Sequence, residues 1–328
     1  MLTLFRTNQL LFSVLLLFYA AILHIGVFVN PPSWQPSGYG FFSKLIYDAI
    51  GSNGLVPDIL AIILLFIQAV AINIITANHR IAESVSLFPG LFYILIASAL
   101  PEFLHLSPLH LANTFYIIAL SELLKIYKKP SCANNIFNVG FWLAIATLFY
   151  PSYAIFLPLG LLGVNVLRAF NIKEWLMVAA GFLVPYILSG TVLLWINDLN
   201  TLINLQFTRE YAFLNFRAYE GYEVYFKIAF YDLFLLIAIF SYSLYVFKKV
   251  MQVQKKINVL YWALLLSGFT LFFQAGIQLD HLLVLAVPLG MLISLNFQSI
   301  ANRWAESFHL LILIIVLFFQ YQEFLLPK

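Results

Sequence analysis

The sequence predicts an all-helical integral membrane protein, a single transmembrane domain (1–328) with about eleven transmembrane helices. The first observation is composition: 63% of the 328 residues are hydrophobic and 9% are charged. Soluble domains carry about 25% charged residues, because a surface that faces water needs them. The second is a series of apolar segments, most of them near the length of about 20 residues that crosses a bilayer. The third is the way basic residues alternate between these segments.

The apolar segments are separated by short turns and a few longer loops. The predicted spans are 10–29, 57–77, 84–100, 110–127, 136–150, 152–168, 174–196, 228–247, 257–275, 281–298 and 306–325. The fifth and sixth are short and meet at Tyr150-Pro151-Ser152, so a single re-entrant hairpin is the alternative to two full spans. The first is too long for a typical signal-peptide core and has no small-residue cleavage site after it. We therefore expect a retained signal anchor.

The basic residues predict the orientation, because cytosolic loops of membrane proteins are enriched in Lys and Arg. With a cytosolic N-terminus, the cytosolic ends hold 12 of the 17 basic residues and the C-terminus lies outside. These 12 are Arg6, Arg80, Lys125, Lys128, Lys129, Arg168, Lys173, Lys248, Lys249, Lys255, Lys256 and Arg303. Every predicted cytosolic segment then has at least one basic residue, which supports the number of spans as well as the direction.

Two outer segments are long enough to carry polar function. The first outer loop, 30–56, begins with proline and glycine and continues as FFSKLIYDAIG, which predicts an amphipathic helix lying in the membrane interface. The second, 197–232, is dense in Tyr and Phe, which suit the headgroup layer. Within it, Arg209 and Arg217 are eight residues apart and would share about one helix face. They would clamp a lipid phosphate or pair with neighbouring glutamates.

Several function classes are excluded by what the chain does not contain. It has no P-loop, no Rossmann glycine fingerprint, no HExxH and no nucleophile elbow. No basic run is interleaved with stacking aromatic residues, so we expect no nucleic-acid partner. Cys132 is the only cysteine and forms no internal disulfide.

Acidic and histidine side chains in the outer segments are the candidates for chemistry. Asp58 follows Pro57, so a carboxylate at a helix start explains it well. Asp48 and Asp280 are less easily explained by capping. His105, His110 and Glu102 are residue types that bind metal, but Pro108 interrupts any helix between the histidines. A divalent metal therefore stays an open cofactor, and interface histidines are the alternative.

Two regions resemble the GT-C superfamily of multi-pass glycosyltransferases, which use polyprenyl-phosphate sugars outside the membrane. One is SPLHLANTFYIIALSELLKIYKK (107–129) with NVGFWLAIATLFYPSYAIFLPLGLLGVNVLR (138–168), and the other is QLDHLLVLAVPLGMLIS (278–294). Together they cover about a quarter of the chain. The resemblance implies a GT-C-like bundle, a bacterial cytoplasmic (inner) membrane location and membrane lipid as a partner, with a polyprenyl-phosphate sugar as donor.

The resemblance also implies roles for residues. An acid in the first outer loop would be the base or a metal ligand, and the matching positions are Asp48 and, less well, Asp58. We expect inverting glycosyl transfer with Asp48 and Asp280 as catalytic residues. Arg209 or Arg217 would hold the leaving phosphate, while His281 and Asp58 would complete the substrate site. The loop has no adjacent acidic pair, so a degenerate, non-catalytic relative remains open.

Two other function classes fit the same sequence. One is a non-catalytic membrane subunit that scaffolds a cell-envelope complex through the aromatic outer segment. The other is a transporter, although the predicted spans hold few polar residues beyond Gln68, Asn73 and Asn113, which argues against ion coupling. A cavity joining Asp48, Asp280 and Arg217 would favour the enzyme, and a flat outer face would favour the subunit.

Overall fold

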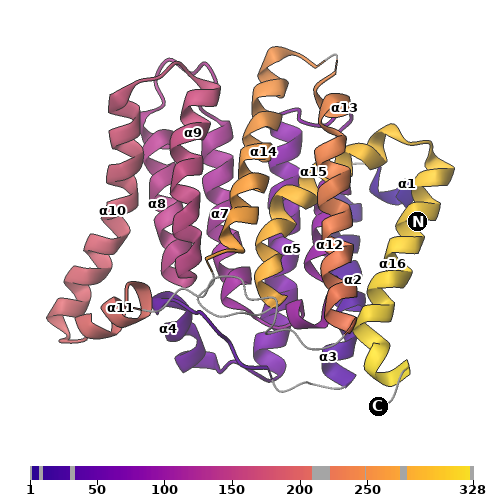
Figure 1. Cartoon of the computed structure of the whole chain (residues 1–328), viewed down its shortest axis with the longest axis horizontal. Helices are drawn as coiled ribbons and strands as arrows, with labels where there is room; N and C mark the ends of the chain where they lie inside the picture. Colours follow the sequence, from indigo (N-terminus) through magenta and orange to yellow (C-terminus); the bar gives the residue numbers. More distant parts are fainter. Residues whose placement is uncertain are drawn as a thin grey trace.

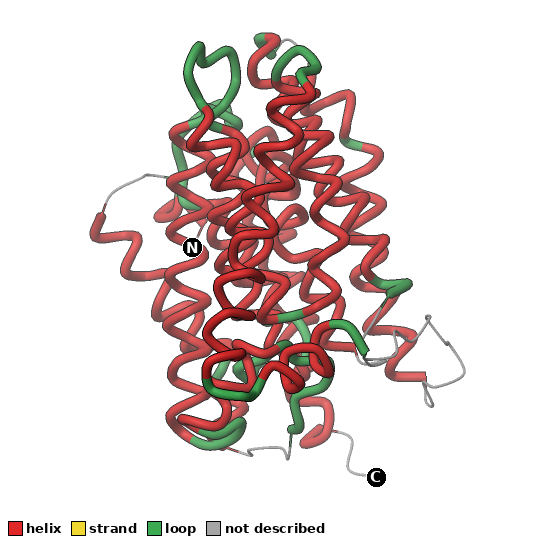
Figure 2. The backbone as a smooth tube through the Cα atoms, turned by 90° about the vertical axis from the view of Figure 1, so that its left-hand side faces the viewer, coloured by secondary structure: helices red, strands yellow, loops and turns green. Residues whose placement is uncertain are grey.

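The chain folds into a bundle of helices that run roughly parallel, with the loops gathered at its two ends (Figures 1 and 2). The structure is a computed structural model that describes residues 2–6, 10–29, 34–208, 222–247, 249–273 and 279–325. It is 81% helical, and the described residues include no strand. The all-α class predicted from composition is therefore confirmed.

The helices follow one another with short connections. The N-terminal half contains α1 (Leu2–Phe5), α2 (Leu10–Leu23), α3 (Ile25–Val29), α4 (Phe41–Ile50), α5 (Leu55–Asn78), α6 (Phe88–Ala97), the 3₁₀ helix η1 (Pro101–Phe103), α7 (Pro108–Leu124), α8 (Ala133–Phe149), the 3₁₀ helix η2 (Pro151–Phe156) and α9 (Leu157–Leu167). The C-terminal half contains α10 (Ile172–Trp195), α11 (Leu199–Gln206), α12 (Tyr222–Phe240), α13 (Tyr242–Val246), α14 (Met251–Thr270), the 3₁₀ helix η4 (Leu279–Leu285), α15 (Ala286–Ser299) and α16 (Asn302–Leu325).

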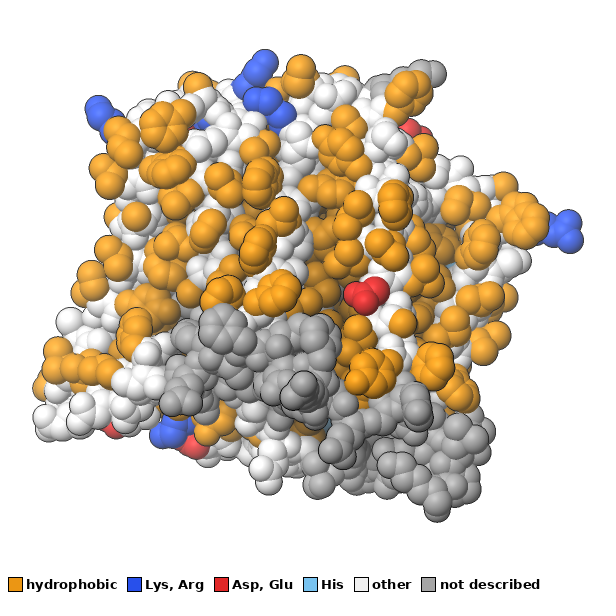
Figure 3. Space-filling model, in the orientation of Figure 1, with side chains coloured by type: hydrophobic (Ala, Val, Ile, Leu, Met, Phe, Trp, Pro, Cys, Tyr) orange, Lys and Arg blue, Asp and Glu red, His pale blue; other side chains and the backbone are white. Residues whose placement is uncertain are grey.

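Four helical segments among the described residues are long and apolar enough to cross a membrane. They are Leu55–Asn78, Ile172–Trp195, Leu279–Ser299 and Asn302–Tyr321. Their outward faces are apolar: Ile63 and Ile67 of α5, Ile187 of α10 and Ile314 of α16 are all exposed. Figure 3 shows hydrophobic side chains spread over the flank of the bundle, with basic side chains near its edges. Such a flank suits lipid as its solvent.

The other predicted spans correspond to shorter helices. The segment 84–100 contains only α6, ten residues long, and every one of them is buried. At 1.5 Å per residue, α6 is about 15 Å long, roughly half the hydrocarbon thickness. The segments 136–150 and 152–168 correspond to α8 and α9, two separate helices joined by η2 at the Pro151 corner. The apolar residues of α6 are therefore buried against other helices of the bundle.

Close helix contacts depend on glycine. α8 packs against α10 through Gly140 and Gly181. A Cβ atom on Gly140 would lie 2.0 Å from the Val178 carbonyl oxygen, and one on Gly181 would lie 2.1 Å from that of Phe137. No larger residue fits at either position without moving the helices apart, as expected where small residues let helix backbones approach in a membrane.

The segments predicted to face outward are joined at one end of the bundle. Tyr47 of α4 donates a hydrogen bond to the Leu106 carbonyl (2.9 Å), Gln206 of α11 donates to that of Leu148 (3.1 Å), and Lys227 of α12 pairs with Glu102 (2.6 Å). Figure 1 shows α4 and α11 at this lower end. We refer to it as the predicted outer end.

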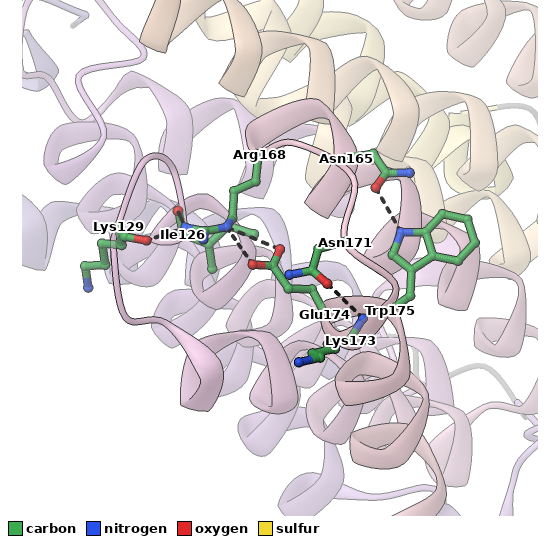
Figure 4. Close-up of polar contacts among 8 residues, drawn as sticks. All are labelled: Ile126, Lys129, Asn165, Arg168, Asn171, Lys173, Glu174 and Trp175. Carbon is green, nitrogen blue, oxygen red and sulfur yellow. Dashed lines mark hydrogen bonds and ion pairs between the residues drawn. The ribbon is translucent and has the colours of Figure 1, made fainter.

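The segments with most basic residues gather at the opposite end, which we refer to as the predicted cytosolic end. Arg6 donates to the Ile300 carbonyl (3.2 Å), and Lys249 pairs with Glu83 (2.8 Å). Arg168 is held most firmly, since it pairs with Glu174 (3.0 Å) and donates to the carbonyls of Lys129 and Ile126 (Figure 4). This arginine ties the turn after α7 to the start of α10.

Candidate functional site

The residues with the chemistry of a site lie at the predicted outer end, on η1, η4 and the starts of α5 and α7. Asp58 is in the first turn of α5, where the negative charge of a carboxylate interacts favourably with the helix dipole. Its Oδ1 atom lies 3.5 Å from Nδ1 of His105, which is in the turn between η1 and α7. Both side chains are buried, with relative exposures of 5% and 3%. Asp58 therefore has a second role beyond the helix start.

His105 is positioned for acid–base chemistry. The Trp34 ring stacks on the imidazole with ring centroids 5.5 Å apart and an interplanar angle of 14°. Burial lowers the pKa of His105 below its usual value, and the Asp58 carboxylate opposes that shift only in part. The ring is therefore neutral at pH 7. Both ring nitrogens, Nδ1 facing Asp58 at 3.5 Å and Nε2, are buried without a hydrogen-bond partner. With the proton on Nδ1, Nε2 keeps a free lone pair.

A second ion pair closes one side of this region. Lys227 of α12 lies 2.6 Å from Oε1 of Glu102 in η1, and Lys227 is the more buried of the two. Oε2 of Glu102 is buried and has no hydrogen-bond partner. The pair links α12 to η1, residues 125 positions apart in the sequence, and it gives the predicted outer end a fixed cation.

Asp280 and His281 lie on η4, in the same end of the bundle. Asp280 is 4% exposed and His281 is fully buried. His281 Nδ1 is 2.8 Å from the hydroxyl of Tyr150, at the corner between α8 and η2. Burial raises the pKa of the Tyr47 hydroxyl on α4 above its ordinary value.

Asp48 is separated from this cluster. Asp48 is on the exposed side of α4, with a side-chain exposure of 61%, and its Oδ2 is 3.6 Å from Nζ of Lys44. The structure therefore brings Asp58, Asp280 and His281 to the same buried end and leaves Asp48 on the surface. Arg209 and Arg217 lie outside the described residues.

The histidines of this end do not converge on a metal site. Within the described ranges, no group of three or more His, Cys, Asp or Glu side chains could hold a metal ion. His110 instead contacts the Ser107 hydroxyl through Nδ1 (3.0 Å), and His24 contacts the Ala20 carbonyl (2.9 Å). The predicted interruption at Pro108 agrees with this: the helix begins there, so His105 lies before it and His110 in its first turn.

Sequence reasoning did not identify the pairings that define the site. The histidine and the acid of the Asp58–His105 pair are 47 positions apart, and no motif links them. Neither Lys227 nor Trp34 was among the predicted site residues. The available signal was weak: an acid after Pro57 and a histidine in a short turn, both on the same predicted side of the membrane.

No protein-family model matches this chain, and the curated proteins include no significant match to it.

Proposed function

We propose that this chain transfers a glycosyl group from a polyprenyl-phosphate sugar at the outer face of a bacterial cytoplasmic membrane. The observation that carries the proposal is the buried Asp58–His105 pair, whose Nε2 atom has no partner, at the end of the bundle that also holds Asp280. A buried acid–base pair without full hydrogen bonding costs stability, and such groups concentrate at functional sites.

The proposal includes a GT-C-like multi-pass architecture of about eleven spans, with the N-terminus cytosolic and the C-terminus outside. Support comes from the contacts that join the first outer loop, η1, η4 and the start of α12 at one end. Further support comes from the basic residues at the other end, where Arg168, Lys249 and Arg6 are bound.

The chemistry assigned to the pair is general base catalysis. His105 Nε2 takes the proton of an acceptor hydroxyl, and Asp58 stabilises the imidazolium that forms. The acceptor oxygen bonds to the anomeric carbon as the bond from that carbon to the phosphate oxygen breaks, with inversion. Lys227, and beyond the described residues Arg209 or Arg217, would offset the charge of the departing polyprenyl phosphate. Asp280 and His281 would hold sugar hydroxyl groups.

The test is a transfer assay in proteoliposomes with radiolabelled polyprenyl-phosphate hexoses and pentoses as donors and membrane extract as the acceptor source. His105→Ala and Asp58→Asn should each lower transfer by about 10²-fold or more, the usual loss with a general base. Asp48→Asn is the matched control, an acid of the same end that is exposed, and it should retain transfer within about twofold.

Two results would contradict this assignment. If Asp48→Asn abolishes transfer and His105→Ala does not, the base is Asp48 and the Asp58–His105 pair is structural. If the folded wild-type protein transfers no sugar from any donor in the set, the catalytic function is wrong.

A non-catalytic subunit of an envelope complex is the second candidate function. The observation that favours it is the position of Asp48, the acid of the first outer loop that best matches the resemblance. Its side chain is 61% exposed beside Lys44, whereas Asp280 is 4% exposed. Stable co-purification of an envelope protein with the wild-type chain, together with absent transfer, would establish this function.

A further inference from the structure

Helix α12 carries a carboxylate on its outward, apolar face. Asp232 is exposed, and so are the next residue, Leu233 (55%), and Leu236 one turn further along α12 (47%). It is ten residues from the start of α12, about 15 Å along the helix, and five residues beyond Lys227. Its neighbour Tyr231 points the other way and donates to the Ile96 carbonyl. Figure 3 shows an acidic side chain surrounded by hydrophobic ones on this flank.

A groove of about 530 Å³ lies between α12, α14 and α9, and its lining on α12 begins at Leu235, three residues after Asp232. Leu235 and Ile239 form its α12 wall, and Trp262, Leu265 and Gly268 contribute to its α14 wall. Asp232, Leu235 and Ile239 are spaced i, i+3 and i+7, so they share one face of α12, with the acid toward the predicted outer end. The α14 residues repeat at three- and four-residue spacing as well.

The α14 wall has a notch at Gly268. A Cβ built there would meet no atom within 4 Å, so the space in front of this residue is open. Small residues at such positions let a second helix approach closely in a membrane. The groove therefore has largely apolar walls on two neighbouring helices and a glycine notch, and Asp232 lies on the same α12 face as the residues that line it.

We propose that this groove docks one transmembrane helix of a partner protein, and that a Lys or Arg of that helix faces Asp232. The argument is charge complementarity. A carboxylate on a lipid-facing helix is costly and is normally paired. A hydrocarbon chain offers no counter-charge, and a lipid phosphate would be repelled.

Three of the described basic residues, Lys227, Lys249 and Arg168, are already bound to acids within this chain. The proposal therefore places the counter-charge for Asp232 on a different polypeptide. This inference is independent of the proposed glycosyl transfer.

The test uses synthetic transmembrane peptides of Leu and Ala in phosphatidylcholine vesicles with the purified, reconstituted full chain. One peptide carries a Lys at the depth of Asp232, one carries Gln there, and one carries the Lys near its other end. Association is measured by energy transfer between labelled peptide and labelled protein. We expect the first peptide to bind at least about tenfold more tightly than the other two.

Two variants identify the surface. Asp232→Asn should lower the affinity of the first peptide to that of the Gln peptide, and Gly268→Leu should abolish binding of all three by filling the notch. Asp48→Asn, an exposed acid away from the groove, should change nothing. Asp232 is exposed, so its replacement should leave the thermal midpoint unchanged.

The proposal would be overturned if the Lys and Gln peptides bound equally, or if Asp232→Asn had no effect. Quenching of Trp262 by brominated lipid gives a second measurement, in a variant that keeps only this tryptophan. Peptide binding should protect Trp262 from the quencher. Equal quenching with and without the peptide would mean that lipid chains occupy the groove, and the docking site would be rejected.

Discussion

The two ends of the bundle differ in how completely their charged side chains are hydrogen-bonded. At the predicted cytosolic end, Arg168 is bound by Glu174 and two carbonyl oxygens, and Lys249 is bound by Glu83. At the predicted outer end, Asp58 Oδ1, His105 Nε2 and Glu102 Oε2 are buried without a hydrogen-bond partner. Asn296, Gln298 and His309 also keep an unpartnered buried atom at the predicted cytosolic end. However, both of the unpartnered buried carboxylate oxygens among the described residues, Asp58 Oδ1 and Glu102 Oε2, lie at the predicted outer end. Because buried charged groups are normally satisfied, we expect substitutions of charged residues to cost more stability at the first end than at the second.

The largest expected effect is on stability at the predicted cytosolic end. Arg168→Ala removes a charged hydrogen-bond donor from Glu174 and from the carbonyls of Ile126 and Lys129 (Figure 4). It leaves a buried carboxylate uncompensated, so we expect a loss of about 3 kcal/mol in the free energy of unfolding. Thermal unfolding in detergent measures it, with the exposed neighbour Lys173→Ala as control. Equal midpoints for the two variants would show that this end is not the stabilising one.

A smaller effect concerns pH at the same end. His79 follows the last residue of α5, and Nζ of Lys256 lies 3.1 Å from its Nδ1. Burial, followed by the positive charge of Lys256, lowers the pKa of His79 from 6.5 to about 4. The unfolded chain therefore binds a proton on this residue below pH 6.5 that the folded chain binds only near pH 4. Stability should be complete above pH 6.5 and fall as the pH decreases toward 4.

The contribution of His79 between pH 6.5 and 5 should be about 1 kcal/mol, after allowance for solvent screening at the helix end. His79→Gln should make the decline in thermal midpoint over this range shallower, and the exposed neighbour Asn78→Gln should not. Identical slopes for His79→Gln and wild type would mean that this histidine does not sense pH. The other buried histidines account for the decline that remains.

The sequence predicted the class of fold well because membrane burial is recorded in composition. It predicted a corner at Tyr150-Pro151-Ser152, and the structure has α8 and α9 as two helices joined there by η2. It predicted 84–100 as a span, but the helix there is α6, only ten residues long and enclosed on all sides. Hydropathy does not distinguish a helix surrounded by protein from one surrounded by lipid.

The candidate site was less predictable, because it depends on pairings between distant segments. Asp58 was explained locally by the start of α5, and that explanation holds. Its partner His105 could only be found from the way the turn after η1 lies against the start of α5 and Trp34. Asp48 has the residue type and loop expected for a base, but it lies on the outward side of α4. The amphipathic pattern of α4 indicates a helix but does not fix which polar residues turn toward η4.

The smallest expected effect is the stability change at the predicted outer end, and it is the sharpest check on the comparison. Asp58→Asn removes a carboxylate that is buried with one unpartnered oxygen. The pKa of His105 is lowered by burial, so its ring is neutral and no uncompensated charge remains after the substitution. Asparagine also supports a helix start. We therefore expect the free energy of unfolding to change by less than about 1 kcal/mol, in contrast to Arg168→Ala. Thermal unfolding of the two variants side by side measures this. A loss for Asp58→Asn as large as that for Arg168→Ala would mean that the Asp58–His105 pair stabilises the fold, and that the two ends do not differ in kind.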